Sequence, residues 1–245
     1  MRMSQREREL RLLNELKESE IANVITQGLN PNVKMKDSGI PWIGMIPEHW
    51  GIRRLSQVSY EHFISNKNIH HQNLLSLSYG RIVRKDINTT DGLLPASFDT
   101  YQVVENGNIV LRLTDLQNDQ KSLRVGLAKE EGIVTSAYVC LGVLNKFVAP
   151  TYLYNVLHSF DIKKLFYSMG GGLRQNLNWQ GLKKIDIPLP PMQEQLDIIA
   201  YIENKCNNID ALMGELQAEI EYLKEYKQSL IADCVTGQIK VQNEL

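Results

Sequence analysis

The feature that most constrains this fold is a long helical pattern near the C-terminus. From Met192 to Thr236 there is no proline, and Gly214 is the only glycine. Apolar residues recur three and four positions apart, interrupted only by Lys227: Ile199, Ile202, Cys206, Ile209, Met213, Leu216, Ile220, Leu223, Leu230 and Cys234. This spacing is typical of a coiled-coil seam. A helix of this length would extend roughly 65 Å at ~1.5 Å per residue, so it needs another helix to cover its seam.

A second helix is predicted at the N-terminus, from Arg2 to Gln27, because Gly28 and Pro31 are typical stop signals. Its Leu13–Thr26 segment aligns without gaps on Leu223–Thr236, and seven of the fourteen aligned residues are identical. Duplication explains such a match, as if one repeat unit had been cut from a longer periodic array. We expect helix packing through Leu10, Leu13, Ile199, Ile202, Ile209, Met213, Leu216, Ile220, Leu223 and Leu230.

The middle of the chain has the pattern of a separate domain. Residues 30–50 form a proline-punctuated connector, and short runs rich in β-branched and aromatic residues follow at 76–84, 100–104, 108–115, 122–128 and 132–144. A helix is predicted from Pro150 to Met169, and Asn178 can cap a short turn before a strand at 185–187. We therefore expect an α+β fold: one globular domain with a curved, mostly antiparallel sheet, plus long coiled-coil helices. The expected domains are 1–29, 30–50, 51–187 and 188–245.

Composition narrows the function classes. The N-terminus has no apolar leader segment and no run approaches membrane-spanning length, so we expect a cytoplasmic protein without membrane contact. The three cysteines lack metal-ligand spacing. Net charge is −1, but residues 50–187 carry +5 and residues 188–245 carry −6. A basic domain on an acidic rod suits a polyanion for the former and a protein partner for the latter.

No catalytic set is visible. There is no phosphate-binding glycine loop, no HExxH, no GxSxG, and no amino-methyltransferase tetrapeptide or magnesium-nuclease core. Basic and amide side chains remain, and these are the residue types that clamp phosphates and read bases. The candidate DNA-binding residues are Lys67, Arg81, Arg84, Lys85, Arg112, Lys121, Arg124, Arg174, Gln175 and Asn176.

Three stretches resemble one family, the DNA-specificity (S) subunits of type I restriction–modification systems. Asp37–Trp50 is similar to that family's passage into a target-recognition domain, and Gly170–Gln195 to its passage out into a conserved helix. The third is Tyr222–Ile239, which is echoed in the N-terminal helix. Met45 departs from the family pattern, in which an acidic residue is common at this position.

The resemblance implies a non-catalytic subunit that selects an interrupted DNA site and holds methyltransferase (M) and restriction or motor (R) subunits. S-adenosylmethionine, magnesium and ATP would belong to those partners, leaving no cofactor here. With one recognition domain, the chain resembles half a subunit, so we expect a homodimer on a palindromic site. Within the family, a truncated or recombination-reservoir fragment is the alternative. Outside it, the alternative is a coiled-coil adaptor whose central domain binds protein.

Overall fold

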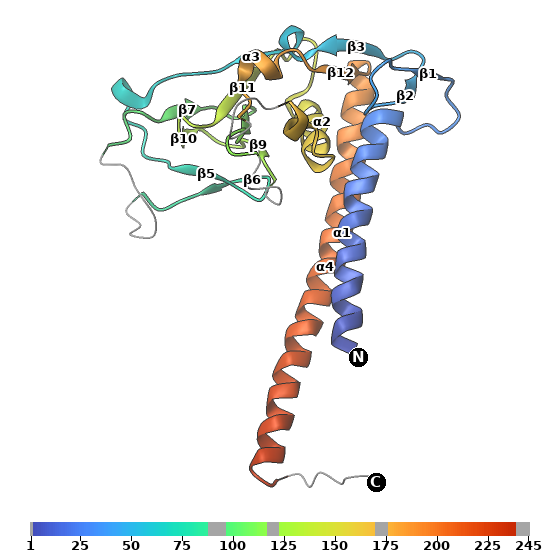
Figure 1. The fold of residues 1–245 in the computed structure, drawn as a ribbon, viewed down its shortest axis with the longest axis vertical. Coiled ribbons are helices and arrows are strands. Elements are labelled where there is room, and N and C mark those ends of the chain that lie inside the picture. Colours follow the sequence, from blue (N-terminus) through green and yellow to red (C-terminus); the bar gives the residue numbers. More distant parts are fainter. Residues whose placement is uncertain (1, 88–96, 117–122, 170–175, 239–245) are drawn as a thin grey trace. The chain divides into compact units, whose positions relative to one another are not determined.

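The computed structural model describes residues 2–87, 97–116, 123–169 and 176–238 (Figure 1). They fall into two compact units, one made of residues 1–20 and 201–245 and the other of residues 21–200. The fold mixes helices with antiparallel sheets, as the sequence predicts. The two long helices run through both units, so the unit boundary does not coincide with the expected domain boundaries.

The long helices have the predicted bounds to within one residue. Helix α1 spans Arg2–Gln27 and helix α4 spans Met192–Val235. In the first unit they run antiparallel, side by side in Figure 1, and polar contacts connect them, including a Lys205–Glu20 ion pair at 4.0 Å. Arg6 Nε lies 3.0 Å from Glu219 Oε2, Lys17 Nζ lies 2.6 Å from Asp210 Oδ1, and the Tyr201 hydroxyl donates to Glu20 at 3.1 Å.

The predicted seam on α4 is buried along only part of its length. Ile202, Ile209 and Ile220 are almost fully buried, whereas Leu230 is 41% exposed. The remaining predicted packing residues are partly buried: Leu10, Leu13, Ile199, Met213, Leu216 and Leu223. The seam is therefore covered where α1 lies beside it and open toward the C-terminal end of α4.

The two copies of the internal repeat end in the same way. The Thr26 hydroxyl donates to the carbonyls of Ala22 and Asn23, and the Thr236 hydroxyl donates to those of Ala232 and Asp233. A glycine with positive φ follows each threonine, at Gly28 (φ 73°) and Gly237 (φ 76°). The similar sequences thus produce similar helix ends, the glycine being displaced by one position.

The domain expected to recognise DNA, residues 51–187 and called the recognition domain below, is built from short antiparallel strands around a shared core. A four-stranded sheet has the order β4-β11-β8-β9, and β10 pairs with β7 and β5 with β6. Leu75, Val104, Val110, Val134 and Cys140 from five of these strands form one buried cluster. The bounds are β4 Ser59–Glu61, β5 Leu75–Ser78, β6 Arg81–Arg84, β7 Gln102–Val104, β8 Ile109–Leu111, β9 Val125–Leu127, β10 Gly132–Val134 and β11 Val139–Val143.

Two segments far apart in sequence close this domain. Strand β3 (Gly51–Arg54), which leads into it, pairs antiparallel with β12 (Asp186–Leu189), which leads out. The connector forms its own pair, β1 (Met35–Asp37) with β2 (Met45–Pro47), and buries Ile46 and Trp50. Ile46 and Trp50 are thus enclosed, whereas Trp42 is 36% exposed.

Fully buried Gln195 in the first turn of α4 fixes the helix start. Its side-chain oxygen accepts from the amide of Ala149 at 2.9 Å, and its nitrogen donates to the carbonyls of Phe147 and Pro190. Nearby, His49 Nε2 lies 2.8 Å from Glu194 Oε2. The Gln195 bonds hold the start of α4 to the recognition domain, and the His49–Glu194 contact holds it to the connector. The residues just after Pro191 therefore anchor the helix.

Several predicted elements differ from the structure. Residues 76–84, expected as one strand, form the β5–β6 hairpin, because Tyr79 and Gly80 both have positive φ and make a two-residue turn. Residues 132–144 split into β10 and β11. Helix α2 (Pro150–Ile162) ends early, since Lys164 is left-handed, and a 3-10 turn at Leu165–Ser168 follows. Asn178 caps the short helix α3 (Trp179–Leu182) as predicted.

Pro188 lies within β12 rather than ending the sheet before it. A proline is tolerated there because β12 belongs to a two-stranded sheet, where one side of the strand needs no ladder donor. The Pro188 carbonyl accepts a hydrogen bond from the buried Tyr152 hydroxyl at 3.2 Å. Burial raises the pKa of this tyrosine well above its ordinary value.

Candidate nucleic-acid interface

The β5–β6 hairpin carries three of the predicted DNA-binding residues. Arg81, Arg84 and Lys85 are all exposed, on β6 and immediately after it. The turn places Tyr79 next to them with 80% of its surface exposed. An exposed aromatic ring beside basic side chains suits contact with a nucleic acid, because a ring can lie against sugars or bases while cations bind phosphates.

Arg84 has an acidic partner within the protein. Its guanidinium forms a bidentate ion pair with Glu130, whose carboxylate also accepts from the Asn73 side chain. The hydrogen bond from Arg84 lowers the pKa of Glu130, and the same contact raises the pKa of Arg84. A phosphate would have to compete with Glu130 for this guanidinium, which makes Arg81 and Lys85 the stronger phosphate candidates.

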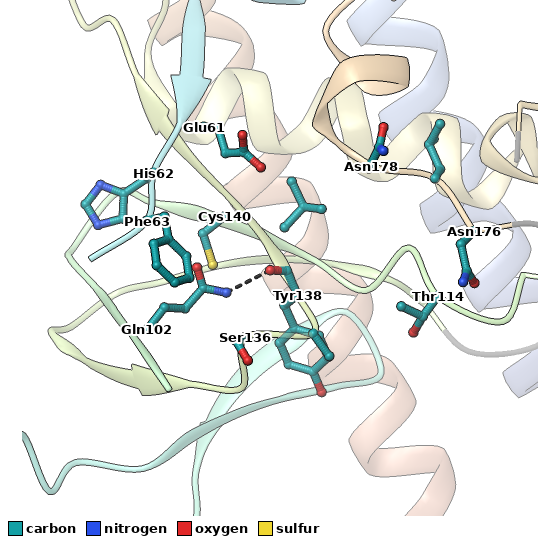
Figure 2. Close-up of a pocket in the computed structure, with 13 residues that line it drawn as sticks. Glu61, His62, Phe63, Gln102, Thr114, Ser136, Tyr138, Cys140, Asn176 and Asn178 are labelled. Atoms are coloured by element: carbon teal, nitrogen blue, oxygen red, sulfur yellow. Dashed lines mark hydrogen bonds between the residues drawn. The ribbon is translucent and has the colours of Figure 1, made fainter. Parts of the chain in front are cut away.

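A pocket of about 280 Å³, lined by both polar and apolar residues, lies elsewhere in the recognition domain (Figure 2). Glu61, His62 and Phe63 line one part and Asn176 and Asn178 another, and Phe63 is 61% exposed. The remaining lining residues are Gln102, Thr114, Ser136, Ala137, Tyr138, Val139, Cys140 and Leu177. Amide and hydroxyl groups can hydrogen-bond to base edges, and the exposed Phe63 ring beside them can contact a base edge-on.

Two side-chain amides that line the pocket are held in place by hydrogen bonds to backbone groups. Asn176 Oδ1 accepts from the Asp115 amide at 2.8 Å. Gln102, only 1% exposed, donates to the Tyr138 carbonyl at 2.7 Å, the dashed line in Figure 2, and to Thr135 at 3.1 Å. Burial raises the pKa of the Cys140 thiol to about 12, so this cysteine at the pocket floor stays protonated near neutral pH. The exposed asparagines are therefore the groups best placed to read a ligand.

Arg124 is wrongly placed in the predicted DNA-binding set. Its side chain is completely buried, and its Nη1 donates to the carbonyls of Arg112 and Thr114 at 3.1 and 2.9 Å. Nη2 donates to the Asp115 carbonyl, and Nε to the Tyr167 hydroxyl. These bonds order the segment that follows β8. The sequence prediction failed because an isolated arginine after a loop gives no sign of burial.

The other candidates are scattered. Lys67 is exposed in the 3-10 turn Asn66–Asn68, and Arg112 is partly buried after β8. Lys121, Arg174 and Gln175 lie outside the described residues. The structure thus brings Arg81, Arg84 and Lys85 together on one hairpin and Asn176 to the pocket. Sequence reasoning missed Tyr79, Phe63 and Asn178, although the Tyr79–Gly80 pair could have indicated a turn.

Within the described ranges, no group of three His, Cys, Asp or Glu side chains is arranged to hold a metal ion. No described helix combines the length and apolarity needed to cross a bilayer.

The fold thus combines a small antiparallel α+β domain, whose two ends pair through β3 and β12, with two long helices that run antiparallel in the first unit. Comparison with known proteins places it in a family. Residues 47–222 match the type I restriction modification DNA specificity domain, and the chain belongs to that family.

Relatives of known annotation agree with this membership. Two are from Methanocaldococcus jannaschii: the type I restriction enzyme MjaVIII specificity subunit, 24% identical over 96% of this chain and 56% of its own length, and the putative MjaX specificity subunit, 23% identical over 96% and 53%. The chain therefore spans about half the length of the curated relatives it matches.

Solved structures share the fold. A chain from a type I R-M system, described for its complex assembly and conformational transition, aligns with a TM-score of 0.63 at 14% identity, over 94% of this chain and 53% of that one. The HsdS subunit from Thermoanaerobacter tengcongensis aligns with a TM-score of 0.54 at 15% identity, over 91% and 51%.

Proposed function

We propose that this chain is the DNA-reading subunit of a type I restriction–modification system. The family match over residues 47–222, which runs from the connector through the recognition domain into α4, carries this proposal. The chain selects the DNA site in the cytoplasm and leaves catalysis to methyltransferase and restriction subunits. S-adenosylmethionine, magnesium and ATP belong to those subunits.

The exposed side chains suggest two separate roles on DNA, phosphate binding and base recognition. Arg81 and Lys85 on the hairpin, with Lys67, would hold phosphates, which positions the protein without reading sequence. Asn176 and Asn178 at the pocket present amides, which can bond to base edges in a groove. The recognised sequence would then depend on the pocket residues, and the overall affinity on the hairpin cations.

Salt-dependent DNA binding tests this function. Fluorescence anisotropy with genomic DNA fragments should show affinity falling steeply between about 50 and 200 mM salt, because each neutralised phosphate contributes about −0.9 to the log–log slope. The double variant Arg81→Glu/Lys85→Glu should flatten the slope by about 2. Lys146→Glu/Lys163→Glu changes the charge equally at two other exposed lysines and should bind like the wild type. Binding that ignores salt would instead favour the protein-binding adaptor.

The finer proposal is a homodimer. The C-terminal part of α4 exposes Tyr222, Tyr226, Leu230, Ile231 and Val235, an apolar surface suited to a second helix. Two identical readers related by a two-fold axis read inverted copies of one half-site, so the site would be palindromic and interrupted. Methylation mapping with the cognate methyltransferase subunit tests this: a methylated sequence with two unrelated halves would contradict a homodimer and favour a fragment that completes another chain.

A further inference from the structure

The two copies of the internal repeat lie in opposite environments. Ile21, Val24 and Ile25 of α1 are 7%, 7% and 0% exposed. Their counterparts in α4 are Ile231 at 53%, Cys234, which is partly exposed, and Val235 at 82%. Because the sequences and the helix ends match, a surface that buries the first copy would also bury the second.

The surface that holds the first copy is known from its contacts. In the first unit, Lys17 Nζ bonds both carboxylate oxygens of Asp210 at 2.6 and 2.7 Å, with only 19% of its side chain exposed. In the second unit, Ile21, Val24, Ile25 and Thr26 are buried, and Gly28 lies against Trp50 and Glu194. The surface that a helix of this sequence occupies in the first unit, called its seat below, is the flank of α4.

Lys227 occupies in the second copy the position that Lys17 occupies in the first. It is exposed, and it is the one residue that interrupts the seam of α4. In an antiparallel pair of α4 helices, the repeat alignment would bring Lys227 to the partner's Asp210. The two-fold axis would then lie midway between those positions, between Ala218 and Glu219.

The seam gives the same register independently. Its residues are arranged symmetrically about Ala218, so that a two-fold axis there would pair Leu216 with the partner's Ile220, Met213 with the partner's Leu223, and Ile209 with the partner's Lys227. The two axis positions agree within one residue. This register explains why Lys227 interrupts the seam, because its aliphatic chain would cover the partner's Ile209 while its amine reaches the partner's Asp210.

We propose that α1 and the C-terminal end of a second copy's α4 compete for one seat. The chain is a closed monomer while its own α1 is seated, and dimerisation exchanges α1 for Leu223–Thr236 of the partner. This rests on the homodimer proposed above. Since α1 is tethered, its effective concentration is on the order of millimolar, so the monomer dominates at lower protein concentration.

A dimer that kept α1 seated would be much weaker. Arg6 meets Glu219, and α1 begins four residues before Arg6, so it extends to about Leu223. About twelve residues of α4 would remain for a partner, roughly three turns, a length at which isolated helix pairing is marginal. Full-length pairing therefore requires the exchange.

The exchange predicts opposite effects for the two equivalent lysines. In sedimentation of the full chain, Lys17→Glu should release α1 and lower the dimer Kd about five- to tenfold, as expected for a partly buried ion pair. Lys227→Glu should raise the Kd by a similar factor. Lys146→Glu carries the same charge change on the recognition domain and should leave the Kd unchanged.

The outcomes separate this proposal from the one it rests on. If the wild type and Lys17→Glu both remain monomeric up to about 1 mM, the homodimer itself is refuted. If a dimer forms but the two variants shift its Kd in the same direction, the homodimer stands and the exchange is overturned. Alkylation gives a second readout: Cys234 would take the place of Val24, so its alkylation should slow about tenfold or more in the dimer, and an unchanged rate would also overturn the exchange.

Discussion

Replacing Arg124 with methionine tests whether this residue supports the fold or binds DNA. Methionine keeps a long, unbranched side chain but removes the hydrogen bonds described above, to the carbonyls of Arg112, Thr114 and Asp115 and to the Tyr167 hydroxyl. Hydrogen bonds from a charged donor contribute about 1.5–3 kcal/mol each, but they are not additive. Removing one partner of a buried charged network typically costs about 3–5 kcal/mol, and we expect a loss in that range.

Thermal unfolding followed by tryptophan fluorescence measures this loss. At about 2–4 °C per kcal/mol for a domain of this size, the unfolding midpoint should fall by about 10 °C. Arg84→Met is the matched control, because Arg84 is exposed and an ion pair at the surface contributes little to stability. Its midpoint should stay near that of the wild type. An Arg124→Met variant that unfolds like the wild type but no longer binds DNA would refute the structural assignment.

Three further predictions concern other groups. Gln195→Leu removes three hydrogen bonds of a buried side chain at the start of α4, so urea denaturation should show a loss of about 2–4 kcal/mol, and a change below 1 kcal/mol would contradict this role. In the folded monomer at about pH 8, iodoacetamide should modify Cys234 well before Cys140, whose raised pKa and burial keep it a thiol. By NMR, Glu130 should titrate below its ordinary pKa of 4.5, and Arg84→Met should raise that midpoint. Because the folded pKa is lowered, the pair stabilises the fold above about pH 4.5 and loses this effect as the pH falls through the folded pKa.

The helices were the part of the fold that sequence could predict. The bounds of α1, and of α4 to within one residue, follow from an apolar period that persists over many turns and from unambiguous stop signals. The short strands were less predictable, because their pairing depends on distant partners. Tyr79 takes a left-handed conformation that a bulky residue rarely adopts, so a hairpin looked like one strand.

Prediction of the candidate interface depended on burial, which sequence does not reveal for single polar residues. Arg81 and Arg124 are both arginines beside apolar residues, yet one is exposed on a hairpin and the other is completely enclosed. The difference comes from the carbonyls that follow β8, which accept from Arg124 and have no counterpart around Arg81 among the described contacts. Composition alone could identify the residue types but not which of them face solvent.

The β3–β12 pair has a consequence for how such proteins can change. The Leu55 amide donates to the Ile185 carbonyl at 2.8 Å, next to this pair, so the two ends of the recognition domain lie side by side. A segment whose ends are adjacent can be replaced by another of different length without moving its attachment points. The β3–β12 pair therefore holds the two attachment points of the domain together, so that the segment between them could change in length and sequence while the connector and α4 keep their structure.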